Sequence, residues 1–217
     1  MTDGQESTVP KVTAEDLVDA ASRAARSLAA ADDRDWEQPA GDLDWSCRRT
    51  LDHIPDALLL YATHLSRQST VRLPFLRNGN DQATPEELLE TLVSAATILA
   101  GVARSAGPDV RAFHPAGMAD PAGFLAMGCD EVLIHTHDIA SGIGIAFEPP
   151  APLCRRILAR LFPWAPADAD PWKALLWANG RLGLTGHERL APDWYWHCAP
   201  LSEWDGTVKK RHQPPAW

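Results

Sequence analysis

One short stretch of the chain places a carboxylate and an imidazole where they can hold a single cation. Within residues 127–140 (MGCDEVLIHTHDIA), Glu131 and His135 are four positions apart. On a helix that turns about 100° per residue, this spacing puts both side chains on one face. Asp138 follows Glu131 by seven positions and returns to within about 20° of the same stripe. Carboxylate oxygens and imidazole nitrogens bind divalent transition metals, provided that a third ligand arrives from another element.

We expect that third ligand to be His53, which lies in the first half of an earlier predicted helix. Two imidazoles and one carboxylate leave a coordination position open for water or substrate, as in catalytic rather than structural zinc sites. Zinc suits this ligand set best, and nickel or iron(II) can also occupy it. An isolated Glu-x-x-x-His pair also occurs as an ordinary surface ion pair, so spacing alone does not choose the partner.

The neighbouring polar residues have other expected roles. His64 follows His53 by eleven residues, about 16 Å along a helix axis, which is too far for the same metal. His137 is about 200° around the helix from His135, so we expect it to pack elsewhere. Asp138 either accepts a hydrogen bond from a ligand imidazole or is an exposed acid at the helix end.

Caps and apolar spacing predict an all-α fold built mainly from four long helices. We expect helices of about 18–22 residues, a length suited to a bundle, between residues 13 and 144. They begin after the caps Thr13, Ser46, Thr84 and Asp120. Pro55 lies inside the second helix and is expected to remove one backbone hydrogen bond and kink the helix near His53.

The chain divides into three expected regions. Residues 1–12 are polar and predict a flexible leader, residues 13–145 the metal-binding four-helix bundle, and residues 150–217 a C-terminal extension rich in Trp and Pro. Within the extension we expect short helices at about 152–162 and 171–182, and a short strand or an extended arm at 194–197. The extension is expected to form a lid or flank on the bundle.

Composition excludes several classes of protein. The formal net charge of −9 disfavours nonspecific nucleic-acid binding, and the basic cluster at 209–212 is predicted to be a solvated tail. Four cysteines without a C-x-x-C pair indicate neither a zinc finger nor a disulfide framework, and Cys129 is expected to pack rather than react. No uninterrupted apolar run approaches 18 residues, so we expect a cytoplasmic protein with no membrane partner.

Two segments together resemble a known family. Residues 45–53 (WSCRRTLDH) and 131–140 (EVLIHTHDIA) are similar to the mycothiol-dependent maleylpyruvate isomerase family, which belongs to the wider DinB/YfiT-like metalloenzymes. Residues 176–184 and 194–200 also look like segments of that family, so the resemblance extends over residues 13–206. It implies a DinB-like four-helix bundle that binds a divalent metal, usually zinc, through His53, Glu131 and His135. Pro55 and His137 depart from the family pattern.

The resemblance also implies a co-substrate and a reaction class. Mycothiol, a low-molecular-weight thiol, would lose its proton at the open metal position and attack an electrophilic carbon of a small metabolite. Addition alone makes an S-transferase, whereas addition, bond rotation and elimination make an isomerase. Arg181 is a candidate clamp for a carboxylate of the thiol or substrate, or else a salt bridge at a helix end. The alternatives are a non-catalytic metal- or small-molecule-binding protein and a metal-dependent hydrolase that uses water.

Overall fold

The structure, a computed structural model of the chain, describes residues 11–31 and 33–211. These residues form six α-helices, one two-stranded hairpin and one short 3-10 helix, so the prediction of a mostly helical fold is confirmed. Most of the predicted leader, residues 1–12, lies outside the described residues. Its last residue, Val12, is buried against the core.

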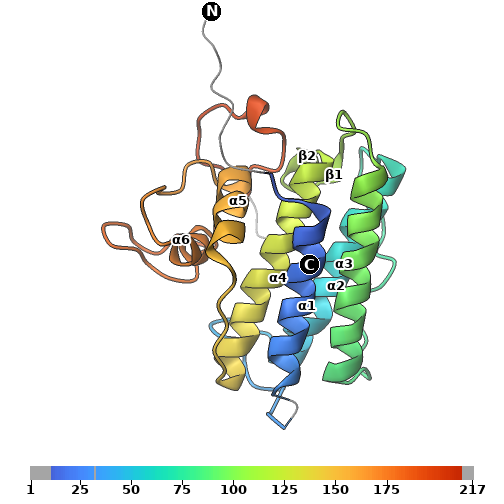
Figure 1. The fold of residues 1–217 in the computed structure, drawn as a ribbon, viewed down its shortest axis with the longest axis vertical. Helices are drawn as coiled ribbons and strands as arrows, with labels where there is room; N and C mark the ends of the chain where they lie inside the picture. The colour runs from blue at the N-terminus through green and yellow to red at the C-terminus, as the bar shows by residue number, and fades with distance from the viewer. Residues whose placement is uncertain (1–10, 32, 212–217) are drawn as a thin grey trace, which may run out of the picture.

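Four long helices lie side by side and enclose most of the apolar core (Figure 1). They are α1 (Ala14–Ala29), α2 (Cys47–Arg67), α3 (Pro85–Ser105) and α4 (Pro121–Ile143). Each begins at its predicted cap, whose side-chain oxygen accepts a hydrogen bond from the backbone N–H three residues later. These caps satisfy amide groups that have no partner inside the helix, which is why the starts were readable from sequence.

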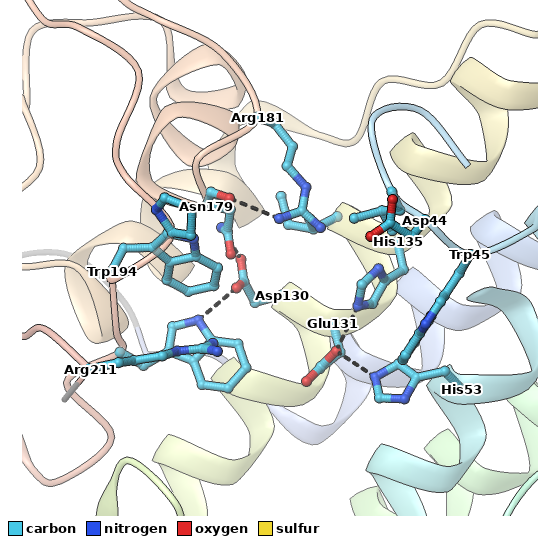
Figure 2. A pocket seen from close by; sticks show the side chains of 14 residues that line it. Asp44, Trp45, His53, Asp130, Glu131, His135, Asn179, Arg181, Trp194 and Arg211 are labelled. Atoms are coloured by element: carbon cyan, nitrogen blue, oxygen red, sulfur yellow. Dashed lines mark hydrogen bonds and ion pairs between the residues drawn. The ribbon is translucent and has the colours of Figure 1, made fainter. Parts of the chain in front are cut away.

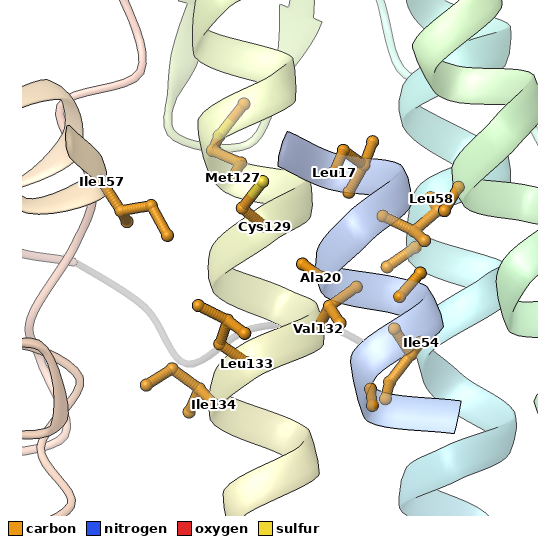
Figure 3. Close-up of a cluster of buried hydrophobic side chains, with 14 of the residues drawn as sticks. Leu17, Ala20, Ile54, Leu58, Met127, Cys129, Val132, Leu133, Ile134 and Ile157 are labelled. Carbon is orange, nitrogen blue, oxygen red and sulfur yellow. The ribbon is translucent and has the colours of Figure 1, made fainter. Parts of the chain in front are cut away.

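The second long helix continues through its internal proline. Leu51, Ile54 and Leu58 of α2 are fully buried, and Figure 3 shows Ile54 and Leu58 among the side chains between α1, α2 and α4. Burial of such a side chain contributes roughly 2 kcal/mol. Three of them outweigh the cost of about 3 kcal/mol for a proline inside a helix. Packing therefore keeps α2 helical from Cys47 to Arg67 and holds His53 on the same helix as the core residues.

By length and composition, α3 is the one helix among the described residues that can cross a membrane, a property that buried helices of soluble proteins share. Here it packs against α1 and α2 and buries Leu88, Leu92 and Leu99. These apolar residues of α3 are therefore part of the helical core.

A hairpin that the sequence analysis did not predict follows α3. It consists of β1 (Ala112–His114) and β2 (Gly117–Ala119), paired antiparallel with His114 opposite Gly117. The amide of Phe113 also donates to the carbonyl of Ser69 at 2.6 Å, which ties the hairpin to the end of α2. Strands of three residues are too short for an alternation of apolar and polar residues to be read.

The C-terminal extension packs on the side of α4 that faces away from α2 and α3 (Figure 1). It contains α5 (Ala151–Leu161), α6 (Pro171–Ala178) and the 3-10 helix η1 (Leu201–Glu203). The second short helix ends four residues earlier than expected, because the chain turns at Gly180 with φ +67°. Residues 194–197 form an extended arm with a single bridge from Trp194 to Lys210 rather than a strand.

One buried arginine connects the extended arm that includes residues 194–197 to the start of α4. Arg160 of α5 donates to the carbonyl oxygens of His197 and Cys198 and pairs with Asp120, the N-cap of α4. Gly123 lies directly beneath this contact. A Cβ atom at Gly123 would overlap the carbonyl oxygen of Cys198 and the Arg160 guanidinium.

We therefore expect Gly123→Ala to destabilise the protein by about 1–3 kcal/mol, the usual effect of overpacking a tight contact. Gly101→Ala is the matched control, since Gly101 also lies inside a helix but a Cβ atom there meets nothing within 4 Å. That control should gain about 0.5–1 kcal/mol from the better helix propensity of alanine. Urea unfolding of the three proteins measures both changes. Equal stability of the two variants would contradict the close packing of the arm on α4.

Candidate metal centre

The structure brings the three predicted ligands together at the interface of α2 and α4. Nε2 of His53 lies 3.6 Å from Oε2 of Glu131, and Nε2 of His135 lies 3.2 Å from the same oxygen. One ligand atom from each residue falls within 4.8 Å of the other two. Figure 2 shows the two imidazoles converging on the carboxylate from different helices.

Glu131 is a charged group placed deep in the protein. Its exposed fraction is 5%, because α4 is covered by α1, α2 and the C-terminal extension. Burial alone would raise the pKa of Glu131, but the hydrogen bonds from His135 and His53 outweigh it and hold that pKa well below its usual range. The carboxylate is therefore anionic and ready to act as a ligand.

Tyr61 occupies the second oxygen of this carboxylate. Its hydroxyl group donates to Oε1 of Glu131 at 2.8 Å, which leaves Oε2 to the two histidines. Burial, together with the nearby charge of Glu131, raises the pKa of Tyr61 well above its usual value and keeps the hydroxyl a donor. A tyrosine at helical spacing from apolar residues is usually a core residue, so the sequence analysis did not single out Tyr61.

Asp138 orients the ligand His135 from the side opposite the metal position. Its Oδ2 atom lies 3.1 Å from Nδ1 of His135, so the opposite ring nitrogen faces the metal position. Of the two roles left open for Asp138, hydrogen bonding to a ligand imidazole is the one observed. Carboxylate–histidine pairs of this kind fix the tautomer and the ring direction at metal sites.

Arg181 lines the cavity beside the ligand cluster and pairs with Asp138. Its Nε and Nη2 atoms donate to the two Asp138 oxygens at 3.0 and 2.7 Å, and Nη1 donates to the carbonyl of Asn179 at 2.9 Å. Burial would raise the pKa of Asp138, but its bonds to His135 and Arg181 lower it to about 2. Arg181 therefore makes a salt bridge that supports His135 indirectly, and it also lines the cavity, where the predicted clamp would be needed.

The other two histidines considered as ligands lie outside the cluster. His64 uses both ring nitrogens on the backbone, with Nδ1 2.8 Å from the carbonyl of Leu60 and Nε2 accepting from the amide of Leu73 at 2.9 Å. His137 packs edge-on against Trp172 with a ring separation of 5.6 Å. Both arrangements agree with the expectation that neither joins His53 at the metal.

A cavity of about 370 Å³ opens beside the three ligands. Much of its wall is apolar or aromatic, contributed by Leu43, Trp45, Ile134, Pro192, Trp194 and Trp196. Figure 2 shows the ligand cluster on one side of this cavity and side chains of the C-terminal extension on the other. A space of this size and lining suits a small molecule.

A buried acid next to Glu131 on α4 faces the side chains of the C-terminal extension. Asp130 accepts hydrogen bonds from the side chains of Asn179 at 3.0 Å and Trp196 at 2.8 Å. Burial raises the pKa of Asp130 to about 7 despite these two bonds. Asn179 and Trp196 belong to the two C-terminal segments that resemble the isomerase family, which was the available signal for this wall.

Arg211 also lines the cavity, so the prediction of a solvated tail was wrong for this residue. Its guanidinium lies over the rings of Trp194 and Tyr195, at 5.3 and 4.9 Å from their centres. Its buried Nε atom makes no hydrogen bond within the described residues. A basic cluster near the end of a chain is usually solvent-exposed, and only the fold of the arm places this member inside. His212 of the same cluster lies outside the described residues.

The donor set fits a divalent metal. Two neutral imidazole nitrogens and one carboxylate oxygen suit zinc, and the hydrogen bond from His135 to Asp138 supplies the usual support behind a histidine ligand. His53 and His135 are only half-buried and line the cavity, so a cation there has one side open to a bound molecule. An open side of this kind is found in catalytic rather than in closed structural zinc sites.

Comparisons with known proteins add no family assignment. No family model matches the chain, and neither a curated protein nor a solved structure matches it. The case for a metal centre therefore depends on the geometry of the described residues and on the sequence motifs that carry them.

We expect His53→Ala and His135→Ala to abolish stoichiometric zinc binding, because each removes one of three ligands contributed by the protein. Metal analysis after dialysis against zinc and then buffer measures the bound amount. His137→Ala is the matched control, since this histidine is on the same helix but packs against Trp172. Unchanged zinc in both ligand variants would contradict the site.

Metal affinity should rise with pH up to about pH 9. Burial would lower the pKa of His135, but hydrogen bonds to Asp138 and Glu131 raise it to about 9 in the metal-free protein. Below that pH the ring must release a proton before it can bind a cation, so affinity should increase about tenfold per pH unit and then level off. Cobalt(II) titrations between pH 6 and 9.5 test this. An affinity that is flat over that range would contradict the raised pKa.

Proposed function

We propose that this chain is a DinB-like four-helix-bundle metalloenzyme, similar to the mycothiol-dependent maleylpyruvate isomerases. In this proposal it uses a low-molecular-weight thiol, mycothiol, to isomerise or conjugate a small electrophilic metabolite in the cytoplasm. The observation that carries the proposal is the convergence of His53, Glu131 and His135 beside a cavity. A purely structural metal would have four protein ligands and no adjoining space.

The residues of the site have two roles in binding the cation. His53, Glu131 and His135 would hold the cation, while Asp138 and Tyr61 keep two of these ligands in the required orientation. The aromatic wall of the cavity excludes water from a bound molecule. The chemistry that zinc supplies when bound is Lewis acidity, which favours the deprotonated form of a thiol at the open position.

The four cysteines support an external nucleophile. All four are buried, and none lines the cavity. Burial raises the pKa of Cys47 to about 11 and that of Cys154 and Cys198 to about 12, so these thiols stay protonated near neutral pH. A reaction that needs a thiolate at this site must therefore obtain it from a bound small molecule.

Arg211 gives this site a preference for an anionic group. Its guanidinium is held over two aromatic rings, its Nε makes no hydrogen bond within residues 11–31 and 33–211, and it lines the same cavity as the ligands. Arginine binds carboxylates through two parallel hydrogen bonds. A carboxylate on the electrophile or on the thiol would therefore face Arg211, whereas Arg181, which lines the same cavity, is already paired with Asp138.

We expect the zinc-loaded protein to convert maleylpyruvate, or another activated alkene or epoxide from a test panel, only when mycothiol is present. Product analysis by liquid chromatography distinguishes a thiol conjugate from a rearranged isomer. His135→Ala should reduce turnover to the background rate. Arg211→Gln should raise KM for the anionic reactant by about tenfold or more, because it removes a hydrogen bond between charged groups. The value of kcat should change little.

Other results assign the site to the competing classes. Product formation that needs zinc but not the thiol would indicate a hydrolase that uses water. Zinc binding without turnover of any panel member would indicate a metal- or small-molecule-binding protein on the same fold. Turnover that survives His135→Ala would contradict a role for the metal centre in the reaction.

A further inference from the structure

A buried hydrogen-bond chain runs from the β1–β2 hairpin to the carboxylate of the metal centre. The amide of Ala116 donates to Nδ1 of His114 at 3.0 Å, and Nε2 of His114 lies 3.4 Å from the hydroxyl oxygen of Tyr61. That hydroxyl group donates to Oε1 of Glu131 at 2.8 Å. His114 is 5% exposed and does not line the cavity, so a bound molecule does not reach it.

The direction of every bond in this chain is determined by its ends. A backbone N–H can only donate, so Nδ1 of His114 carries no proton, and burial lowers the pKa of His114 to about 3, which keeps the ring neutral. The single ring proton is therefore on Nε2, directed at Tyr61. Because the Tyr61 oxygen accepts this proton and a carboxylate can only accept, the tyrosine proton is directed at Glu131.

The ring of His114 is held in place by its neighbours. It lies edge-on or tilted against Tyr61, Phe124 and Trp196, with ring centres 5.2, 6.4 and 5.5 Å away. The hairpin is itself tied to α2 through the bond from Phe113 to Ser69. A histidine with these contacts keeps its donor pointed at Tyr61.

We propose that His114 is a positioning residue of the metal centre: through Tyr61 it holds Glu131 with one oxygen engaged and the other presented between His53 and His135. This inference rests on the proposed function, since it concerns a site that binds a cation. Removal of the His114 donor leaves the tyrosine hydroxyl free to turn away from the carboxylate. Partners of this outer kind change metal affinity by about 10–100-fold when they are removed.

Two substitutions at His114 separate the donor from the rest of the ring. Asparagine places its amide near the position of Nδ1, so His114→Asn keeps a partner for Ala116 and loses the donor to Tyr61. Glutamine reaches the position of Nε2, so His114→Gln keeps that donor. Tyr61→Phe removes the hydroxyl itself. His64→Gln is the control, because His64 is an equally buried histidine near the hairpin that bonds only to the backbone.

The measurements are cobalt(II) affinity by competition with a chelator and the visible absorption bands of bound cobalt, which report ligand geometry. We expect affinity about tenfold weaker with altered bands for His114→Asn, and about 10–100-fold weaker for Tyr61→Phe. His114→Gln and His64→Gln should stay within about threefold of the wild type. The double variant His114→Asn, Tyr61→Phe should be no weaker than Tyr61→Phe alone, since both act through one chain.

A separate measurement tests the chain without any metal. Nitrogen NMR of the metal-free protein should show the His114 proton on Nε2. If His114→Asn does not fold, Tyr61→Phe still tests the chain, because it keeps the aromatic packing. Equal losses of affinity in His114→Asn and His114→Gln, or no loss in His114→Asn and Tyr61→Phe, would overturn the positioning role. A wild-type protein that binds no cobalt would instead overturn the metal centre of the proposed function.

Discussion

The site depends on one buried carboxylate. Glu131 is charged in the middle of a helical core, where an isolated carboxylate would cost several kcal/mol. Three side chains offset that cost: the hydroxyl of Tyr61 on one oxygen and the imidazoles of His53 and His135 on the other. A divalent cation between these imidazoles and the carboxylate would supply the positive charge that the cluster is arranged to receive. Two of these partners, His135 and Tyr61, are in turn held by a further contact.

The contacts that support the site come mainly from the C-terminal extension and the β1–β2 hairpin, which lie outside the four long helices. Asp138, behind the ligand His135, is held by Arg181, and Asp130, beside Glu131, is held by the side chains of the C-terminal extension. On the opposite side, His114 of the small hairpin supports Tyr61. The extension and the hairpin therefore complete the site, while the long helices α2 and α4 carry its ligands. Rigid support of this kind is what holds ligands near a productive geometry.

The fold was predictable where a local rule decides the structure. The caps at Thr13, Ser46, Thr84 and Asp120 start helices because unpaired amides at a helix start need an acceptor, and this need is local. The kink expected at Pro55 did not end or shorten α2, because burial of its apolar stripe outweighs one lost hydrogen bond. The hairpin could not be predicted, since its short strands form through pairing with each other and with the end of α2.

For the metal centre, the amino-acid order determined which residues share a helix face. The spacing of Glu131, His135 and Asp138 follows from helix geometry, and the motif around His53 supplied the candidate partner. Only the tertiary structure decided which oxygen of Glu131 faces the imidazoles, that Arg181 is used on Asp138, and that Arg211 lies inside the cavity. The physical reason is that hydrogen bonding and burial of these side chains join residues distant in sequence, and periodicity within one helix carries no information about the element that packs against it.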